Sequence, residues 1–299
     1  MTLHIIGNGF DLRHKIKSRY ENFKDYAWKH CGSKGYFLGV LEQCYHQLDS
    51  KGELLLWSDL ERALGNPDIA AVQAEATEDI EYEEGHEIRY QPAMEDAAGF
   101  LVPDMFSVFH TLFEEWVNAI DITDAERISS LAHFDSNGFF LSFNYTDTLE
   151  SIYGIPRNQI NYIHGRRNSG DEIIVGHCSE VDANAQLPKD PMIYDYQAYD
   201  TIAELVNEER KKVSDIIRNN QDYWPKLKLV DKVVVYGHSL ADVDMPYLLE
   251  IVKNVRQDAE WYFSIYYSNP IEKQAECERV NSFISEVGLN ANNCHTFQM

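Results

Sequence analysis

The stretch of residues 139–165 constrains the fold more than any other part of the chain. An apolar run ends on Asn144, and a second apolar run ends on His164 and Gly165 about twenty residues later. Polar side chains that follow successive strands are typical of an open parallel sheet, which builds its ligand site at the carboxyl ends of its strands. We therefore expect these two strand ends to contribute to one site.

Short apolar runs alternate with helical patterns along much of the sequence. The expected strands are residues 3–6, 139–143, 161–164, 172–177, 232–238 and 261–267. A helix is expected between Asp200 and Asp222, and Pro246 and Pro270 suit the first turns of two more. Asp242 or Asp244 would cap the helix at Pro246, and Asn269 would cap the one at Pro270. This alternation predicts an α/β fold, with a doubly wound and mostly parallel sheet.

Residues 31–135 have a different character. Their apolar residues recur every three or four positions, which indicates amphipathic helices, and an acidic loop is expected near residues 73–98. We therefore expect a core of residues 1–30 and 136–299, interrupted by a mostly helical insertion at 31–135. The insertion is a candidate cover for the site or a surface for a homo-oligomer.

Composition narrows the classes of function. The formal net charge of −23 disfavours binding to nucleic acid and to anionic membranes, because both carry negative charge. The five cysteines form no C-x-x-C pair, so we expect neither a disulfide framework nor a metal site. No apolar stretch approaches the ~20 residues of a membrane span, and no signal peptide is evident, so a cytoplasmic protein is expected.

Glycines follow the first expected strand. Gly7, Asn8 and Gly9 lead into a helix that contains Asp11. Such a turn lets a phosphate approach the backbone, and the helix start offers N–H donors. The alternative is a tight strand-to-helix turn with no ligand.

The next candidates follow the second and third strands of this region. Asn144 offers a carbonyl acceptor and an amide donor, and Asp147 lies on the helix that follows. His164 is a candidate general base, and Arg166 is a candidate partner for a pyrophosphate. The alternatives are that Asn144 only caps a helix and that His164 is structural.

A third glycine turn follows residues 232–236. Gly237, Ser239 and Asp242 would form an anion cradle before the next helix. The sequence GHSLA also looks like the nucleophile elbow of a serine hydrolase, with Asp258 and His295 as the formal partners.

Four ordered segments together resemble the AbiH family, which is associated with bacterial abortive infection against phage. They are IIGNGFDL, FLSFNYTDTLE, NYIHG and VVYGHSLADVDMPY. AbiH-like proteins are in turn similar to the sirtuin-like superfamily, whose members hold NAD in a Rossmann-type domain and in several defence systems hydrolyse it. The resemblance implies a Rossmann-like core with a large helical insertion.

The same resemblance implies roles for individual residues. Gly7 and Gly9 would match the phosphate-approach glycines, Asn144 the asparagine near the nicotinamide ribose, and His164 the catalytic histidine. Gly237 and Ser239 would match the turn on the adenosine side. The pattern Asn-x-Asp is not kept, because Thr146 holds its third position and the acid follows at Asp147. Protein deacylation is not expected, because the chain lacks paired zinc cysteines.

The function expected from the resemblance is an anti-phage effector that binds NAD or NADP and hydrolyses the nicotinamide–ribose bond. NAD(P) would be substrate or ligand, and no prosthetic group is expected. The alternative is a non-catalytic sensor of a nucleotide or ADP-ribose within a defence assembly. A serine hydrolase is less favoured, and for a nuclease we find no metal-ligand cluster.

Overall fold

The chain divides into two compact units. The sheet unit comprises residues 1–18, 117–174 and 212–299, and the helical unit comprises residues 19–116 and 175–211. The structure is a computed structural model that describes residues 1–78, 80 and 87–299. None of the described helices is long and apolar enough to cross a membrane.

The sheet unit contains six strands in one parallel sheet. They are β1 (Thr2–Ile6), β2 (Phe139–Ser142), β3 (Ile160–Tyr162), β4 (Lys232–Tyr236), β5 (Glu260–Ile265) and β6 (Cys294–Gln298). The strand order is β3-β2-β1-β4-β5-β6 and every pairing is parallel. This is the order of a Rossmann fold, in which the winding direction reverses between β1 and β4. The expected α/β class and parallel sheet are confirmed.

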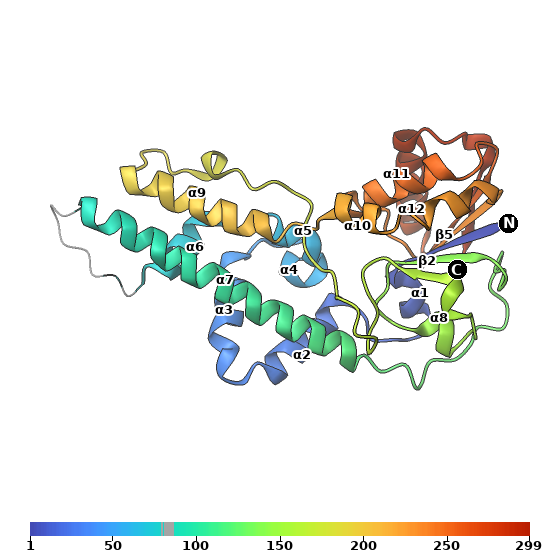
Figure 1. Ribbon diagram of the computed structural model, residues 1–299, viewed down its shortest axis with the longest axis horizontal. Coiled ribbons are helices and arrows are strands. Elements are labelled where there is room, and N and C mark those ends of the chain that lie inside the picture. Colours follow the sequence, from blue (N-terminus) through green and yellow to red (C-terminus); the bar gives the residue numbers. More distant parts are fainter. Residues whose placement is uncertain (79, 81–86) are drawn as a thin grey trace. The chain divides into compact units, whose positions relative to one another are not determined.

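Helices cover both faces of this sheet (Figure 1). They are α1 (Asn8–Arg13), α8 (Thr148–Ser151), α10 (Val213–Asn219), α11 (Met245–Asn254) and α12 (Pro270–Val287), with the 3-10 helices η2 (Arg157–Gln159), η4 (Trp224–Leu229), η5 (Asp242–Asp244) and η6 (Ala291–Asn293). Side chains alternate between the faces along each strand. Leu3 and Val233 therefore pack with α11 and α12, whereas Phe140 packs with α1 and α8 on the other face.

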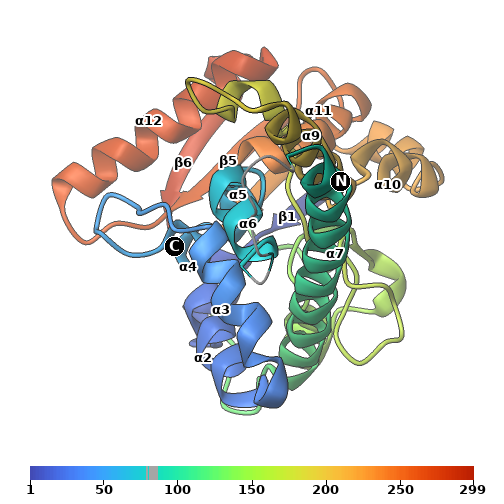
Figure 2. The same ribbon diagram turned by 90° about the vertical axis from the view of Figure 1, so that its left-hand side faces the viewer.

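The helical unit is built around aromatic side chains. Its elements are α2 (Tyr20–His30), η1 (Gly32–Lys34), α3 (Gly35–Cys44), α4 (Leu55–Ser58), α5 (Leu60–Leu64), α6 (Ile69–Ala76), most of α7 (Glu87–Ala119), η3 (Ala183–Gln186) and α9 (Ile193–Glu208). Phe23 packs its ring against Phe113 and Trp116 with ring centroids 5.1 and 5.4 Å away. Helices α2, α3 and α6 follow one another as packed neighbours (Figure 2).

The unit boundaries differ from the expected 31–135 insertion. Residues 175–211 belong to the helical unit, because α9 packs on α6 and η3. Of the acidic loop expected near residues 73–98, positions 79 and 81–86 lie outside the described residues. Its later part is not a loop, since α7 already begins at Glu87.

Two expected elements are corrected. The helix expected over residues 200–222 is interrupted between α9 and α10, where Lys211 donates its N–H to His177 O at 2.9 Å and its buried ammonium pairs with Glu61. The expected strand 172–177 does not join the sheet. Its Ile174 N–H donates instead to His164 O, at 3.0 Å.

One strand was not expected at all. Strand β6 has the sequence CHTFQ and lies mostly exposed at the edge of the sheet, beside β5. A polar edge strand carries no apolar pattern, so sequence alone does not reveal it. The helix starts were read correctly at two points, since proline lies in the first turn of both α11 and α12 and the Asn269 side chain caps α12.

Candidate functional site at the carboxyl edge of the sheet

The four segments singled out in the sequence meet at one edge of the sheet. Strands β3, β2, β1 and β4 are consecutive neighbours and all run in the same direction. Residues 7–11, 144–147, 164–166 and 237–242 directly follow their carboxyl ends. Ligands of open α/β sheets bind at this edge, near the point where the winding reverses.

The glycines after β1 and β4 allow two backbone turns to touch. Gly9 donates its N–H to Gly237 O at 2.8 Å. A Cβ on Gly7 would lie 2.5 Å from His238 Cα, and a Cβ on Gly237 would lie 2.4 Å from Phe10 N. Gly237 also has a φ of +58°, which favours glycine. The close approach of the two turns therefore explains why glycine is needed at these positions, even without a ligand.

Asp11 is a fully buried carboxylate beneath this edge. Its two oxygens accept hydrogen bonds from the hydroxyls of Thr146, at 2.5 Å, and Thr148, at 2.9 Å. Burial raises the pKa of Asp11 to about 6, although the threonine hydrogen bonds act in the opposite direction. The β1 segment and the β2 segment are thus joined through a carboxylate that is costly to ionise.

Asn144 links the ends of β1 and β2. Its amide Nδ2 donates to Gly7 O at 3.1 Å, and its backbone N–H donates to Ser142 Oγ at 3.2 Å. An Asn144 bond also helps to lower the pKa of Asp11. Asn144 Oδ1 enters no hydrogen bond within the described part of the chain. This oxygen can therefore accept a hydrogen bond from a ligand.

Asp147 occupies a different environment from the one expected for the acid of an Asn-x-Asp pattern. It accepts hydrogen bonds of 2.5 Å from both Arg167 Nε and Ser151 Oγ. Burial would raise the pKa of Asp147, but these bonds outweigh it and lower the pKa below its ordinary value. The carboxylate next to Asn144 and Thr146 is Asp11, from the helix that follows the glycine turn after β1.

His164 is buried among aromatic rings. Its ring meets those of Phe143 and Tyr247 edge to face, each with centroids 5.5 Å apart. The following Gly165 has a φ of +85°, and a Cβ there would lie 2.1 Å from Glu172 O. Glycine at this position therefore allows the backbone of Glu172 and Ile173 to approach closely.

His238 and Asp244 were not expected to be site residues, although both lie in the GHSLADVD segment and Asp244 was expected to cap a helix. His238 Nδ1 accepts the Leu240 N–H at 2.9 Å, so the neutral ring carries its proton on Nε2. That Nε2 lies 3.4 Å from Asp244 Oδ2. The ring of Phe143 also contacts His238, with centroids 4.4 Å apart. Two buried histidines thus share one aromatic neighbour.

The remaining predicted residues have other partners or are exposed. Arg166 pairs with Glu150 at 3.3 Å and lies over the Tyr162 ring. Asn8 and Ser18 exchange hydrogen bonds, and Asp242 is exposed at the start of η5. Ser239 is also exposed, and its carbonyl accepts a 2.9 Å bond from Arg279 of α12.

A serine-hydrolase triad is not assembled. Ser239 follows the carboxyl end of β4, whereas Asp258 precedes β5 and His295 is the second residue of β6. In a parallel sheet those positions lie at opposite edges. Asp258 is moreover engaged with Arg256 at 2.6 Å. Among the residues that the structure describes, no three His, Cys, Asp or Glu side chains are grouped to hold a metal ion.

Fold and site together define a Rossmann-like α/β protein whose polar segments gather at the carboxyl edge around the β1–β4 reversal. The family model described as bacteriophage abortive infection AbiH matches residues 3–265. The chain belongs to the AbiH family, and this membership implies a role in abortive infection against phage. No curated protein and no solved structure matches the chain.

Proposed function

We propose that this AbiH-family protein binds NAD or NADP at the carboxyl edge of its sheet and hydrolyses the nicotinamide–ribose bond. The observation that carries the proposal is the convergence of four chemically distinctive segments at the β1–β4 reversal of a Rossmann-ordered sheet. That is the position at which this class of fold holds dinucleotides.

The proposed roles follow from the contacts of each side chain. Asn144 Oδ1 accepts a hydrogen bond from a ribose hydroxyl or from the attacking water, and His164 acts as the general base. Asp11 holds Asn144 and Thr146 in place and adds negative potential, which favours the oxocarbenium-like transition state. Asp147 fixes Arg167, and Arg166 exchanges Glu150 for the pyrophosphate.

Burial gives the proposal a regulatory consequence. Asn144 is 6% exposed and His164 is 3% exposed. Substrate therefore reaches them only when the Gly165 or Gly237 segment moves, and such a movement is a suitable point for a phage-derived trigger to act. The proposal therefore predicts low basal turnover, as expected of a protein that stops the growth of its own host.

The test is release of free nicotinamide from NAD by the purified full-length protein. His164→Ala should lower the rate by about a hundredfold or more, since a positioned general base contributes roughly that much. Asn144→Ala should also lower the rate, because it removes the acceptor that positions the ribose or the attacking water. His295→Ala, which alters an exposed histidine on β6, is the matched control. Thermal unfolding of each variant separates lost chemistry from lost structure. Undiminished release by both site variants would contradict the assignment.

One observation favours a second function, that of a nucleotide sensor without catalysis. The position of the expected acid is held by Thr146, and Asp147 is neutralised by Arg167. A sensor would bind NAD or ADP-ribose to saturation and release no nicotinamide. Calorimetric titration alongside the release assay distinguishes the two functions.

A further inference from the structure

A pocket lies at the opposite edge of the same sheet. It has a volume of about 180 Å³, and its lining consists of Phe139, Asn158, Gln159, Ile160, Asn161, Tyr223 and Lys226. Phe139 begins β2 and Ile160 begins β3, so the pocket is at the amino edge. At about 3.3 Å per residue it is roughly 16 Å along β2 from Asn144.

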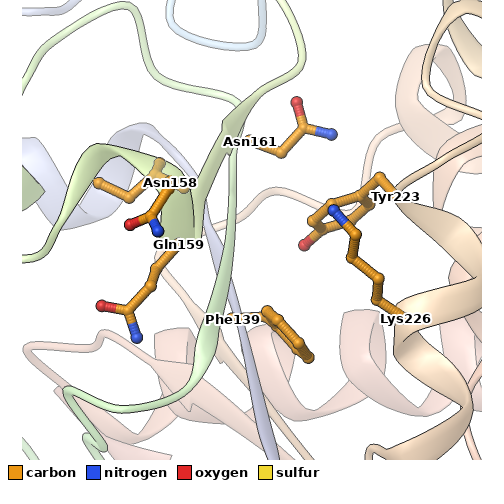
Figure 3. Close-up of a pocket in the computed structure, with 7 residues that line it drawn as sticks. Phe139, Asn158, Gln159, Asn161, Tyr223 and Lys226 are labelled. Carbon is orange, nitrogen blue, oxygen red and sulfur yellow. The ribbon is translucent and has the colours of Figure 1, made fainter.

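The Tyr223 hydroxyl is the main indication that a ligand belongs there. Tyr223 is 9% exposed, and its hydroxyl has no hydrogen-bond partner among the described residues. In Figure 3 this hydroxyl is turned toward the strand side of the pocket. A buried hydroxyl without a partner is destabilising, so native proteins rarely keep one unless something completes its hydrogen bonding.

Three carboxamide side chains, those of Asn158, Gln159 and Asn161, belong to the lining on the strand side of the pocket (Figure 3). The amide of Asn161 donates to Asn220 Oδ1 at 2.8 Å, which orients its own Oδ1 as a free acceptor. Asn220 is in turn held by a 2.8 Å bond from its amide to Ile216 O. Asn158 adds a donor and an acceptor that no described residue engages. Together they suit the alternating donors and acceptors on the edge of a polar ring.

Charge and size restrict the ligand further. Lys226 is exposed at the rim and enters no ion pair within the described part of the chain, which gives a strongly acidic protein a local cation. The Phe139 and Tyr223 rings supply apolar surface. A cavity of about 150 Å³ accepts one benzene ring, so this pocket suits one substituted six-membered ring and is too small for a dinucleotide.

We propose that this amino-edge pocket binds a small anionic molecule built on one planar polar ring, of the pyrimidine carboxylate class. The Tyr223 hydroxyl and the Asn158 and Asn161 carboxamides bind the polar edge of the ring. Lys226 binds the carboxylate. The site is separate from the carboxyl-edge site, and its occupancy does not depend on NAD chemistry.

Three probes test the proposal with the full-length protein by ligand-observed NMR and calorimetry. Orotate has both the polar ring edge and the carboxylate, uracil lacks the carboxylate, and benzoate lacks the polar edge. Orotate should bind at least about tenfold more tightly than either of the others, because each missing feature removes about one favourable interaction. Absence of orotate binding at millimolar concentration, or equal binding of all three, would overturn the proposal.

Two variants place the ligand in the pocket. Tyr223→Phe keeps the ring and should weaken orotate about tenfold, while the free protein becomes no less stable because an unpartnered hydroxyl is removed. Lys226→Met should weaken orotate about tenfold and leave uracil unchanged. Lys228→Met, on the same η4 but outside the lining, is the matched control. Orotate binding that neither Tyr223→Phe nor Lys226→Met reduces would place it elsewhere and refute the assignment.

Discussion

At the scale of single residues, the least expected feature is the environment of Asp11. The sequence presents it as one polar residue after a glycine turn, yet it is the carboxylate on which the ends of β1 and β2 converge. Its burial makes the ionised form expensive. Such groups are often found where a protein holds functional side chains in place.

The raised pKa of Asp11 predicts a particular pH dependence of stability. The folded protein binds this proton more tightly than the unfolded chain, because the pKa rises from 3.8 to about 6 on folding. Ionised Asp11 therefore destabilises the fold above about pH 6, and the penalty disappears as the pH falls toward 3.8. Asp11→Asn removes the titration. Relative to wild type, the variant should gain about 2–3 kcal/mol of unfolding free energy between pH 4 and pH 7, at about 1.4 kcal/mol per pKa unit.

Denaturant unfolding at the two pH values measures this difference. Asp222→Asn, a change at an exposed position, should give the same difference from wild type at both pH values. If the Asp11→Asn difference is likewise independent of pH, the raised pKa is wrong.

Candidate site residues could be predicted from the sequence where they directly follow an apolar strand pattern. Asn144 and His164 both follow apolar runs, and the structure puts them at the same edge as Gly7 and Gly237. The carboxylate beside Asn144 could not be predicted, because Asp147 is closer to Asn144 in sequence whereas Asp11 is closer through the sheet. Only the pairing of β1 with β2 reveals that neighbour.

At the scale of elements, the turn after β4 is held from several directions. Gly237 packs on the Gly9 backbone, and Arg279 of α12 donates to the carbonyls of His238 and Ser239 at 3.1 and 2.9 Å. Leu240 has a φ of +56°, which is unusual for a residue with a branched side chain. The turn is therefore held in its conformation by its neighbours.

Two glycine-to-alanine changes separate backbone conformation from close packing. Gly237 and Gly288 both have left-handed φ angles, +58° and +71°, but a Cβ on Gly288 would meet nothing within 4 Å. Gly288→Ala should therefore cost only about 1 kcal/mol of unfolding free energy. Gly237→Ala should cost about 3 kcal/mol or more, because its Cβ would also collide with backbone. Chemical denaturation of both variants compares them, and equal losses would show that the two turns are not packed as described.

Helices and strands could be predicted where the pattern of apolar and capping side chains determines them. Buried strands such as β4 and helices with proline in the first turn were recognised. Strand β6 could not be predicted, because an exposed edge strand needs no apolar pattern. Residues 172–177 have the apolar pattern of a strand but do not join the sheet, and sheet membership is a tertiary property that local sequence does not carry.

At the scale of the whole molecule, the charge of −23 affects stability more than fold. Like charges repel most strongly in the compact state, and salt screens them over a Debye length of about 10 Å at 0.1 M. The unfolding temperature should therefore rise when NaCl increases from about 20 to about 200 mM. KCl at equal ionic strength should give the same rise in differential scanning fluorimetry. A constant or falling unfolding temperature would show that favourable ion pairs outweigh the repulsion.

The division into two units also belongs to this scale. Both units are assembled from segments that are distant in sequence, since residues 19–116 and 175–211 interrupt the sheet unit twice. A single insertion at 31–135 was the simpler interpretation of the helical pattern. The second interruption, at residues 175–211, could not be predicted from the sequence. The pattern of α9 is that of an ordinary crossover helix, and only its packing against α6 assigns it to the helical unit.

The central claim is that the four strand ends form one nucleotide site. Hydrogen–deuterium exchange of the full-length protein with and without NAD tests it most directly. The account predicts that NAD slows exchange in residues 7–11, 144–148, 164–167 and 237–244 together, and that Asn144→Ala reduces the protection in all four. NAD binding that protects a different part of the chain and leaves these four segments unchanged would contradict it.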